Sequence, residues 1–248
     1  MEKKNKMKCM VIAALATLSL LTACDANSTK TVNVATDGGT SHEDGKGKNV
    51  VRKRLAVQGD FSYLTNIGSI NIVYTQGEYG MEVEGDSAVL QHLKTSYDSN
   101  LLTVSMGTDG NSDINLYGNV SNATMYLSCP DLKCVSICGN GGFECRGTWR
   151  GDDLQVGVLG TGELKLDTVE CNTFAMQSTT ISVISIGALK ARMADVMTRT
   201  NAVVDMNVDV DELTVLNDGR PKMTLTGKAD NLMIKNPKDD NLVNKIIQ

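Results

Sequence analysis

The chain has 248 residues, which is enough for one large domain or two small ones. Hydrophobic residues make up 41% of it and aromatic residues 4%, so the composition excludes a wholly disordered chain, a collagen and a small disulfide-stapled toxin. The formal net charge of −5 argues against a nucleic-acid-binding protein, which would usually carry a basic face.

The N-terminus has the organisation of a secretory signal. Residues 1–8 carry four lysines against one glutamate, and residues 9–21 are almost wholly apolar or small, in a run too short for a comfortable membrane span. The run ends in Leu21-Thr22-Ala23-Cys24, which resembles a bacterial lipobox. The resemblance implies a signal peptide over residues 1–23 and a diacylglyceryl group on Cys24. The alternative is a plain signal peptide cut near Ala23.

Cleavage after residue 23 changes the charge of the chain. It removes four lysines and one glutamate, which leaves 20 basic and 28 acidic residues and a net charge of −8. Because an acidic chain does not favour anionic lipid or DNA, we expect the lipid on Cys24 to supply the membrane attachment, and we expect no nucleic-acid partner. Residues 24–49 have few large apolar side chains, so they are expected to form a flexible tether.

From residue 50 to residue 131, short runs alternate apolar and polar residues, each bounded by Gly, Asn, Asp or Ser. This alternation predicts half-buried strands, which we interpret as the N-terminal rungs of a repeat structure. One helical turn over residues 87–93 is expected to interrupt them, with Asp86 or Ser87 as its N-cap.

Residues 132–236 repeat with a period close to 20. Strand-like segments begin at Leu132, Leu154, Phe174, Ala194, Leu213 and Leu232. A second series begins about ten residues into each repeat, at Phe143, Leu164, Ile184, Val204 and Met223. Each unit is therefore predicted to contain two short strands, and a fixed period of this length indicates a solenoid.

The alternation within each unit favours a β-helix over a leucine-rich horseshoe, because a helix would show a spacing of 3.6 residues. Alternate residues, Val204 among them, are expected to point into a continuous column of Leu, Val, Ile and Met. One rung could not bury this apolar face alone, but stacked neighbours can. A narrow aliphatic column also fits the low aromatic content.

Short motifs follow one another in a characteristic order along the chain. They are Gly59-Asp60-Phe61, residues 70–77, Val83-Glu84-Gly85-Asp86, residues 125–132, and the turns Gly139-Asn140-Gly141 and Gly160-Thr161-Gly162. Over residues 50–236 this order resembles the head GIN domain family of auto-transporter adhesins, found mainly in envelope lipoproteins of Bacteroidetes-type bacteria. The resemblance implies a single all-β domain, a right-handed parallel β-helix with rungs of about 20 residues. It supplies no catalytic residue. Residues 237–248 form a tail that could cap the open end.

The five cysteines beyond Cys24 do not predict a metal site. They lack the paired spacing of zinc ribbons and have no histidine nearby. Cys134 and Cys145 fall at positions predicted to point inward, where cysteine acts as a small apolar residue. A disulfide remains an alternative in an oxidising compartment, although the sequence does not give its pairing.

An acidic cluster, formed by Asp205, Asp209, Asp211 and Glu212, is the nearest approach to a catalytic set. β-Helix enzymes that cut acidic polysaccharides use such carboxylates with calcium. Here the acidic residues alternate with Met and Val, so they are expected to point outward from a strand. We interpret them as a solvated edge that deters aggregation.

Trp149 is the candidate ligand-binding aromatic. It lies between Arg146 and Arg150, with Asp152 close behind, in the unit with the longest spacing. A loop tryptophan between two arginines could stack on a sugar or anchor a protein partner. The alternative is that Trp149 folds back over the corner of a rung.

Together these features predict a lipid-anchored cell-envelope protein, an outer-membrane lipoprotein facing the periplasm or the surface. It would present a rigid β-helix for adhesion or scaffolding, with a glycan or protein ligand, no cofactor and no catalysis. The alternative is a carbohydrate-active enzyme, a polysaccharide lyase or hydrolase. That enzyme would need converging carboxylates or a Lys or Arg base in a concave face.

Overall fold

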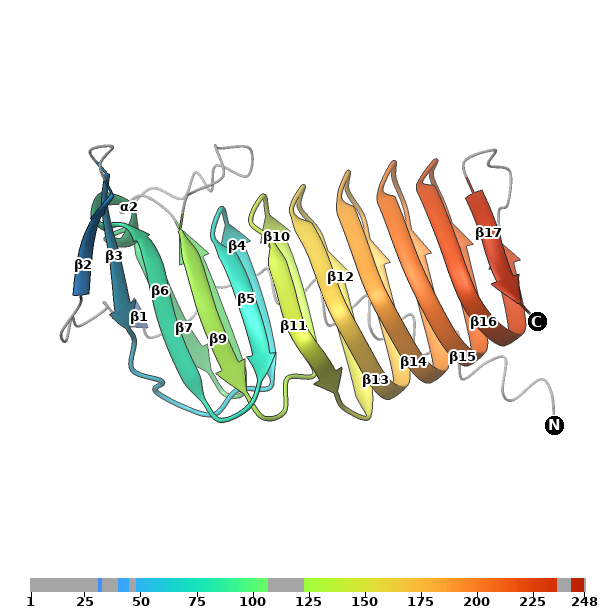
Figure 1. Cartoon of the computed structure of the whole chain (residues 1–248), viewed down its shortest axis with the longest axis horizontal. Helices are drawn as coiled ribbons and strands as arrows, with labels where there is room; N and C mark the ends of the chain where they lie inside the picture. Colours follow the sequence, from blue (N-terminus) through green and yellow to red (C-terminus); the bar gives the residue numbers. More distant parts are fainter. Residues whose placement is uncertain (1–30, 33–39, 45–47, 107–122, 236–241, 248) are drawn as a thin grey trace.

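The computed structural model describes residues 31–32, 40–44, 48–106, 123–235 and 242–247, with side chains described from Val50 onward. The described part is almost entirely β-structure, with one short helix. Strands follow one another along the long axis of an elongated molecule, with the early strands at one end and β17 at the other (Figure 1). No helix in this part of the chain is long and apolar enough to cross a membrane.

The strands form two faces that enclose a common core. The first face begins, in spatial order, with β2 (Thr40–Asp44), β3 (Lys48–Arg54), β6 (Gly80–Asp86), β9 (Thr124–Cys129), β5 (Asn71–Gln76) and β11 (Phe143–Arg150). It continues through the first halves of four long strands, β13 (Glu163–Ser178), β14 (Val183–Thr198), β15 (Val203–Asn217) and β16 (Lys222–Lys235). The last strand of this face is β17 (Leu242–Ile247). The second face runs through β1 (Thr31–Val32), β7 (Leu93–Asp98), β8 (Leu101–Met106), β4 (Tyr63–Gly68), β10 (Cys134–Gly139), β12 (Asp153–Val158) and the second halves of β13 to β16.

The C-terminal half is a parallel solenoid with the predicted period. Strands β13 to β16 each bend from the first face to the second, and successive strands pair in parallel. Ile184 lies beside Val204, which lies beside Met223, and all three are buried. The predicted fold class, a parallel β-solenoid with rungs of about 20 residues, is therefore confirmed.

The N-terminal end differs from a regular stack of rungs. On the first face β9, β6, β3 and β2 pair antiparallel in succession, and on the second face β8, β7 and β1 do the same. The helix α2 (Ser87–Leu90) connects β6 to β7, and the carboxylate of Asp86 accepts a hydrogen bond from the Ala88 amide at 2.9 Å. The predicted helical turn and its cap are confirmed, although Leu93 already belongs to β7.

Strands are present in both segments that the sequence pattern placed outside the β-helix, the predicted tether and the C-terminal tail. Strands β1 and β2 lie within residues 24–49, where we expected a tether, and β3 begins at Lys48. At the other end, β17 pairs in parallel with the first half of β16, so part of the tail adds a strand to the first face.

Large rings occupy the core where the rungs are least regular. Tyr74, Phe143 and Trp149 are buried with ring centroids 6.0 to 6.2 Å apart. The later rungs fill the same column mainly with aliphatic side chains such as Leu164 and Ile184, and Phe174 is the buried ring of β13. The aliphatic column was therefore predicted correctly for those rungs, while the middle of the solenoid uses aromatic packing.

The predicted position of Cys134 was wrong by one residue. Cys134 lies beside Gln155 and Tyr63, and the inward positions belong to Val135 and its neighbours on the adjacent strands. Cys134 is still only 9% exposed, but a shift of one residue moves a side chain to the other face of a strand. Cys145 does lie in the core, as predicted. Cys129, Cys134, Cys145 and Cys171 are free thiols.

Candidate binding groove

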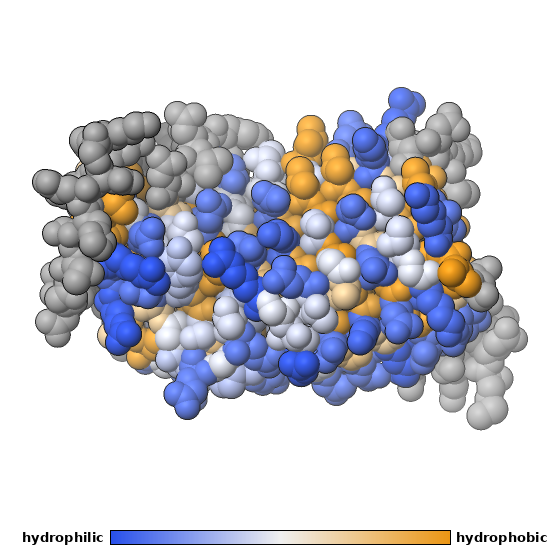
Figure 2. Space-filling model, viewed as in Figure 1, coloured by the Kyte–Doolittle hydropathy of each residue, from blue (hydrophilic) through white to orange (hydrophobic). Residues whose placement is uncertain are grey.

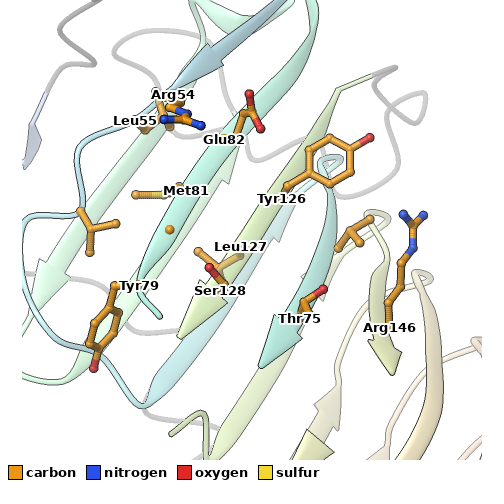
Figure 3. A pocket seen from close by; sticks show the side chains of 13 residues that line it. Arg54, Leu55, Thr75, Tyr79, Met81, Glu82, Tyr126, Leu127, Ser128 and Arg146 are labelled. Atoms are coloured by element: carbon orange, nitrogen blue, oxygen red, sulfur yellow. The ribbon is translucent and has the colours of Figure 1, made fainter. Parts of the chain in front are cut away.

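An open groove of about 640 Å³ lies on the first face, over β6, β9, β5 and the start of β11 (Figure 3). Its size is in the range of small-molecule binding sites. The buried side chain of Val73 on β5 is the apolar part of the floor, while Met81 and Leu127 border the groove with their side chains turned inward to the core. Polar and aromatic side chains stand around them, as Figure 3 shows for Tyr79, Tyr126 and Arg146.

The register of the sheet explains how distant residues meet here. Arg54 on β3 lies beside Glu82 on β6, Glu82 lies beside Tyr126 on β9, and Tyr126 lies beside Val73 on β5. Val73 in turn lies beside Glu144 on β11. Alternation within each strand turns these side chains toward one side, so the row crosses the strands instead of following one of them.

Ion pairs hold the first part of this row. The Arg52 guanidinium donates to Glu82 at 2.9 Å, lies 3.4 Å from Glu84, and sits over the Tyr126 ring at 4.8 Å from the centroid. The hydrogen bond from Arg52 lowers the pKa of Glu82 below its ordinary value, so this carboxylate stays ionised. Arg54 is exposed and makes no ion pair within the described residues.

A second set of charges stands at the β11 side of the groove. Glu144 accepts hydrogen bonds from Arg146 at 3.1 Å and from Lys165 at 3.2 Å. These donors, Arg146 first, lower the pKa of Glu144. The Arg146 side chain is half exposed and lines the groove.

Tyr79 and two hydroxyls complete the lining. The Tyr79 ring is 37% exposed and meets the buried Phe61 ring edge to face, with the centroids 5.5 Å apart. Partial burial raises the pKa of Tyr79, so its hydroxyl stays protonated and can donate. Ser128 donates to the Glu78 carbonyl at 2.6 Å, and Thr75 is exposed beside it.

This arrangement suits binding better than catalysis. Glu82 is the carboxylate that lines the groove, and its lowered pKa is the opposite of what a general acid requires. The described residues contain no group of three or more His, Cys, Asp or Glu side chains able to hold a metal ion. The groove therefore offers hydrogen-bond donors and aromatic rings around the apolar side chain of Val73.

Trp149 does not present its ring to solvent, so of the two readings of this residue the structure supports the one in which Trp149 folds back onto the domain. Its side chain is 0% exposed, and its indole N–H donates to the Leu132 carbonyl at 2.8 Å. Trp149 follows Phe143 and Cys145 at even spacing along β11, so alternation places all three side chains on the inward side. A β-bulge, where Arg146 and Gly147 together oppose Asp167, brings Trp149 into register beside the buried Val169 on β13.

The other residues predicted with Trp149 separate in space. Arg146 lines the groove, whereas Arg150 lies beyond the bulge and makes an ion pair with Glu170 at 3.0 Å. Asp152 is exposed after the end of β11, outside the groove lining. Cys24, the predicted lipid-attachment residue, lies outside the described residues.

The acidic cluster is exposed along β15, as its alternation indicated. Asp205, Asp209, Asp211 and Glu212 all face solvent. Asp209 lies between Lys190 and Lys228 on the neighbouring strands, so its charge is part of a mixed ladder. None of the four lines the groove.

Sequence reasoning missed Arg54, Tyr79 and Tyr126. They come from separate segments that only the strand order brings together. The available signal was Tyr126 at an outward position between the apolar Met125 and Leu127.

The fold and the groove define a class: a two-faced parallel β-solenoid with a ligand-sized cleft near its antiparallel N-terminal end. The profile of the family described as "Putative auto-transporter adhesin, head GIN domain" matches residues 60–188, which is more than half of the chain. The chain belongs to that family, as the sequence motifs indicated.

Solved structures share the fold. A putative adhesin from Bacteroides fragilis superposes with a TM-score of 0.59 at 14% identity, covering 81% of this chain and 97% of its own. A putative adhesin from Parabacteroides distasonis gives 0.57 at 13% identity, covering 81% and 96%. A putative lipid binding protein from the same species gives 0.51 at 12% identity, covering 83% and 99%. Among curated proteins, none matches this chain.

Proposed function

We propose that this protein is a non-enzymatic, lipid-anchored adhesin or scaffold of the cell envelope that binds its ligand, a glycan or a protein, in the groove on the first face. The observation that carries the proposal is the groove lining, which brings together the Arg54 and Arg146 guanidinium groups and the rings of Tyr79 and Tyr126. Membership of a family of auto-transporter adhesins supports the same role.

The arrangement of charges supports a binding protein over a polysaccharide hydrolase, one form of the alternative. Two carboxylates with different pKa values would be needed for acid–base hydrolysis. Glu82 and Glu144 both have lowered pKa values and both are held by basic side chains. Neither can act as a proton donor at neutral pH.

The anchor is proposed from the sequence of residues 1–24. A diacylated Cys24 would attach the chain stably to the outer membrane, because two acyl chains bind far more strongly than one. The variant Cys24→Ala should move the protein from the membrane fraction to the soluble fraction. Recovery of that variant in the membrane fraction would contradict the anchor without affecting the groove.

The binding function is tested with the chain from residue 24 onward, carrying Cys24→Ala, on an array of glycans and matrix proteins. The variant Thr75→Trp fills the groove from an exposed position on β5, so it should abolish binding while the melting temperature stays unchanged. Thr161→Trp, at an exposed turn after β12, is the matched control and should bind like the wild type. Equal binding by Thr75→Trp, or cleavage of a bound glycan, would overturn the proposal.

A further inference from the structure

We infer that the groove selects an acidic oligosaccharide, whose carboxylate or sulfate groups meet Arg54 and Arg146 while its rings lie over Tyr79 and Tyr126. This inference rests on the proposed function and names the class of ligand. It is argued from the hydrogen-bonding capacity of the lining, the strand pairing beneath it and the positions of the arginines.

The lining is rich in donors and poor in free acceptors. Each arginine carries five N–H groups in a rigid fork that suits carboxylate and sulfate oxygens. Arg52 directs two of its nitrogens to Glu82 and Glu84, Arg146 directs one to Glu144, and Arg54 makes no ion pair among the described residues. The carboxylates here are already occupied, so a ligand must bring acceptors, and anionic groups are the strongest of these.

The strand pairing disfavours a peptide as the occupant. An extended peptide usually binds a sheet by pairing its backbone with an open edge. Below the groove, β6 pairs with β3 and β9, and β5 pairs with β9 and β11, so each floor strand is paired on both sides. The groove therefore offers side chains only, which suits the hydroxyls and ring faces of a saccharide.

The arginines set the length of the ligand. Arg54 lies on β3 and Arg146 on β11, at opposite sides of the groove lining. Four strand-to-strand steps separate β3 from β11, which is about 19 Å at the usual spacing of strands. One monosaccharide cannot reach both arginines, so the ligand is an oligomer that crosses the strands.

The test uses matched probes that differ in charge. They are hexagalacturonate, its fully methyl-esterified form, a sulfated chondroitin oligosaccharide, and the peptide hexaglutamate, each titrated against the chain from residue 24 with Cys24→Ala. We expect at least one of the two acidic saccharides to bind, with an affinity that falls as salt is raised. We expect the ester and the peptide to bind at least tenfold more weakly.

Arginine variants then assign the contacts. Arg54→Ala and Arg146→Ala should each weaken binding about 10- to 100-fold, as loss of a charge-assisted hydrogen bond does. Arg150→Ala is the control, because Arg150 shares β11 with Arg146 but pairs with Glu170 outside the groove. Equal binding of the ester, stronger binding of the peptide, binding of neither acidic saccharide, or an unchanged affinity in Arg54→Ala would overturn the inference.

Failure of this inference is distinguishable from failure of the proposed function. If a neutral glycan or a protein binds and Thr75→Trp removes that binding, the groove remains the binding site and only the ligand class is wrong. If ligands bind equally to wild type and Thr75→Trp, the groove itself is not the site and both proposals fail.

Discussion

Replacement of Val204 by aspartate is the sharpest test of the stacked column. Val204 is 1% exposed on β15, between Ile184 and Met223 on the neighbouring strands, so its partners on both sides are apolar. Loss of its burial costs about 1.5–3 kcal/mol. An unpaired carboxyl group in this position adds several kcal/mol more, whether it ionises or is forced to stay protonated.

The total, about 5 kcal/mol or more, is comparable to the whole stability of a typical domain. We therefore expect Val204→Asp to be unfolded or to melt at least about 10 °C lower in a thermal scan followed by circular dichroism. Val203→Asp changes the adjacent residue, which is 43% exposed on the opposite side of the same strand, and should alter stability by no more than about 0.5 kcal/mol. A wild-type melt for Val204→Asp, or a larger loss for Val203→Asp, would refute the inward assignment.

Three further predictions follow from buried polar and titratable groups. Trp149→Phe removes the hydrogen bond to the Leu132 carbonyl and should lower the free energy of unfolding, measured in urea, by about 1–3 kcal/mol, with ligand affinity unchanged. A loss of affinity at unchanged stability would instead identify Trp149 as a ligand contact. Burial raises the pKa of Asp195, so the folded state favours its protonated form, and the stability that this group contributes is present at low pH and lost as pH rises through the folded pKa. Asp195→Asn should therefore raise the melting temperature at pH 7 and not at acidic pH. An equal effect at both pH values would contradict the assignment. Burial raises the pKa of Cys145 to about 12 from 9.0, so stability should fall between those pH values, and Cys145→Ala should show a shallower fall in urea titrations.

The later rungs were predictable because their repeat is regular. A spacing of 19 or 20 residues between Phe174, Ala194 and Leu213 fixes which residues become neighbours, and the structure pairs them as expected. Alternation cannot tell parallel from antiparallel strands, so the reversed pairing of β6 and β9 was not predictable from their pattern. The first repeat interval, from Leu132 to Leu154, is longer than the others, so the one-residue shift in the pairing of Cys134 was also not predictable.

The candidate site was only partly predictable. Arg146 was singled out from its neighbourhood and does line the groove, but Trp149 was assigned to a loop, because the glycine and charged residues around it hid the continuation of β11 through Gly147 to Arg150. Gly147 has φ +79°, a conformation that glycine adopts readily and that a local pattern does not reveal. Arg54 and Tyr126 join Arg146 through the order of the strands, which depends on long-range pairing.

Polar side chains cover much of the face seen in Figure 2, and apolar surface gathers toward the C-terminal rungs. Ile181, Val183 and Val203 are exposed in these rungs. That apolar surface is the main competitor of the groove as a place for a ligand to bind.

A crystal structure of the soluble chain with its strongest array ligand compares the two surfaces most directly. Our account predicts that the ligand lies in the groove, over Tyr126 and between Arg54 and Arg146. A ligand bound elsewhere, with the groove empty, would contradict it.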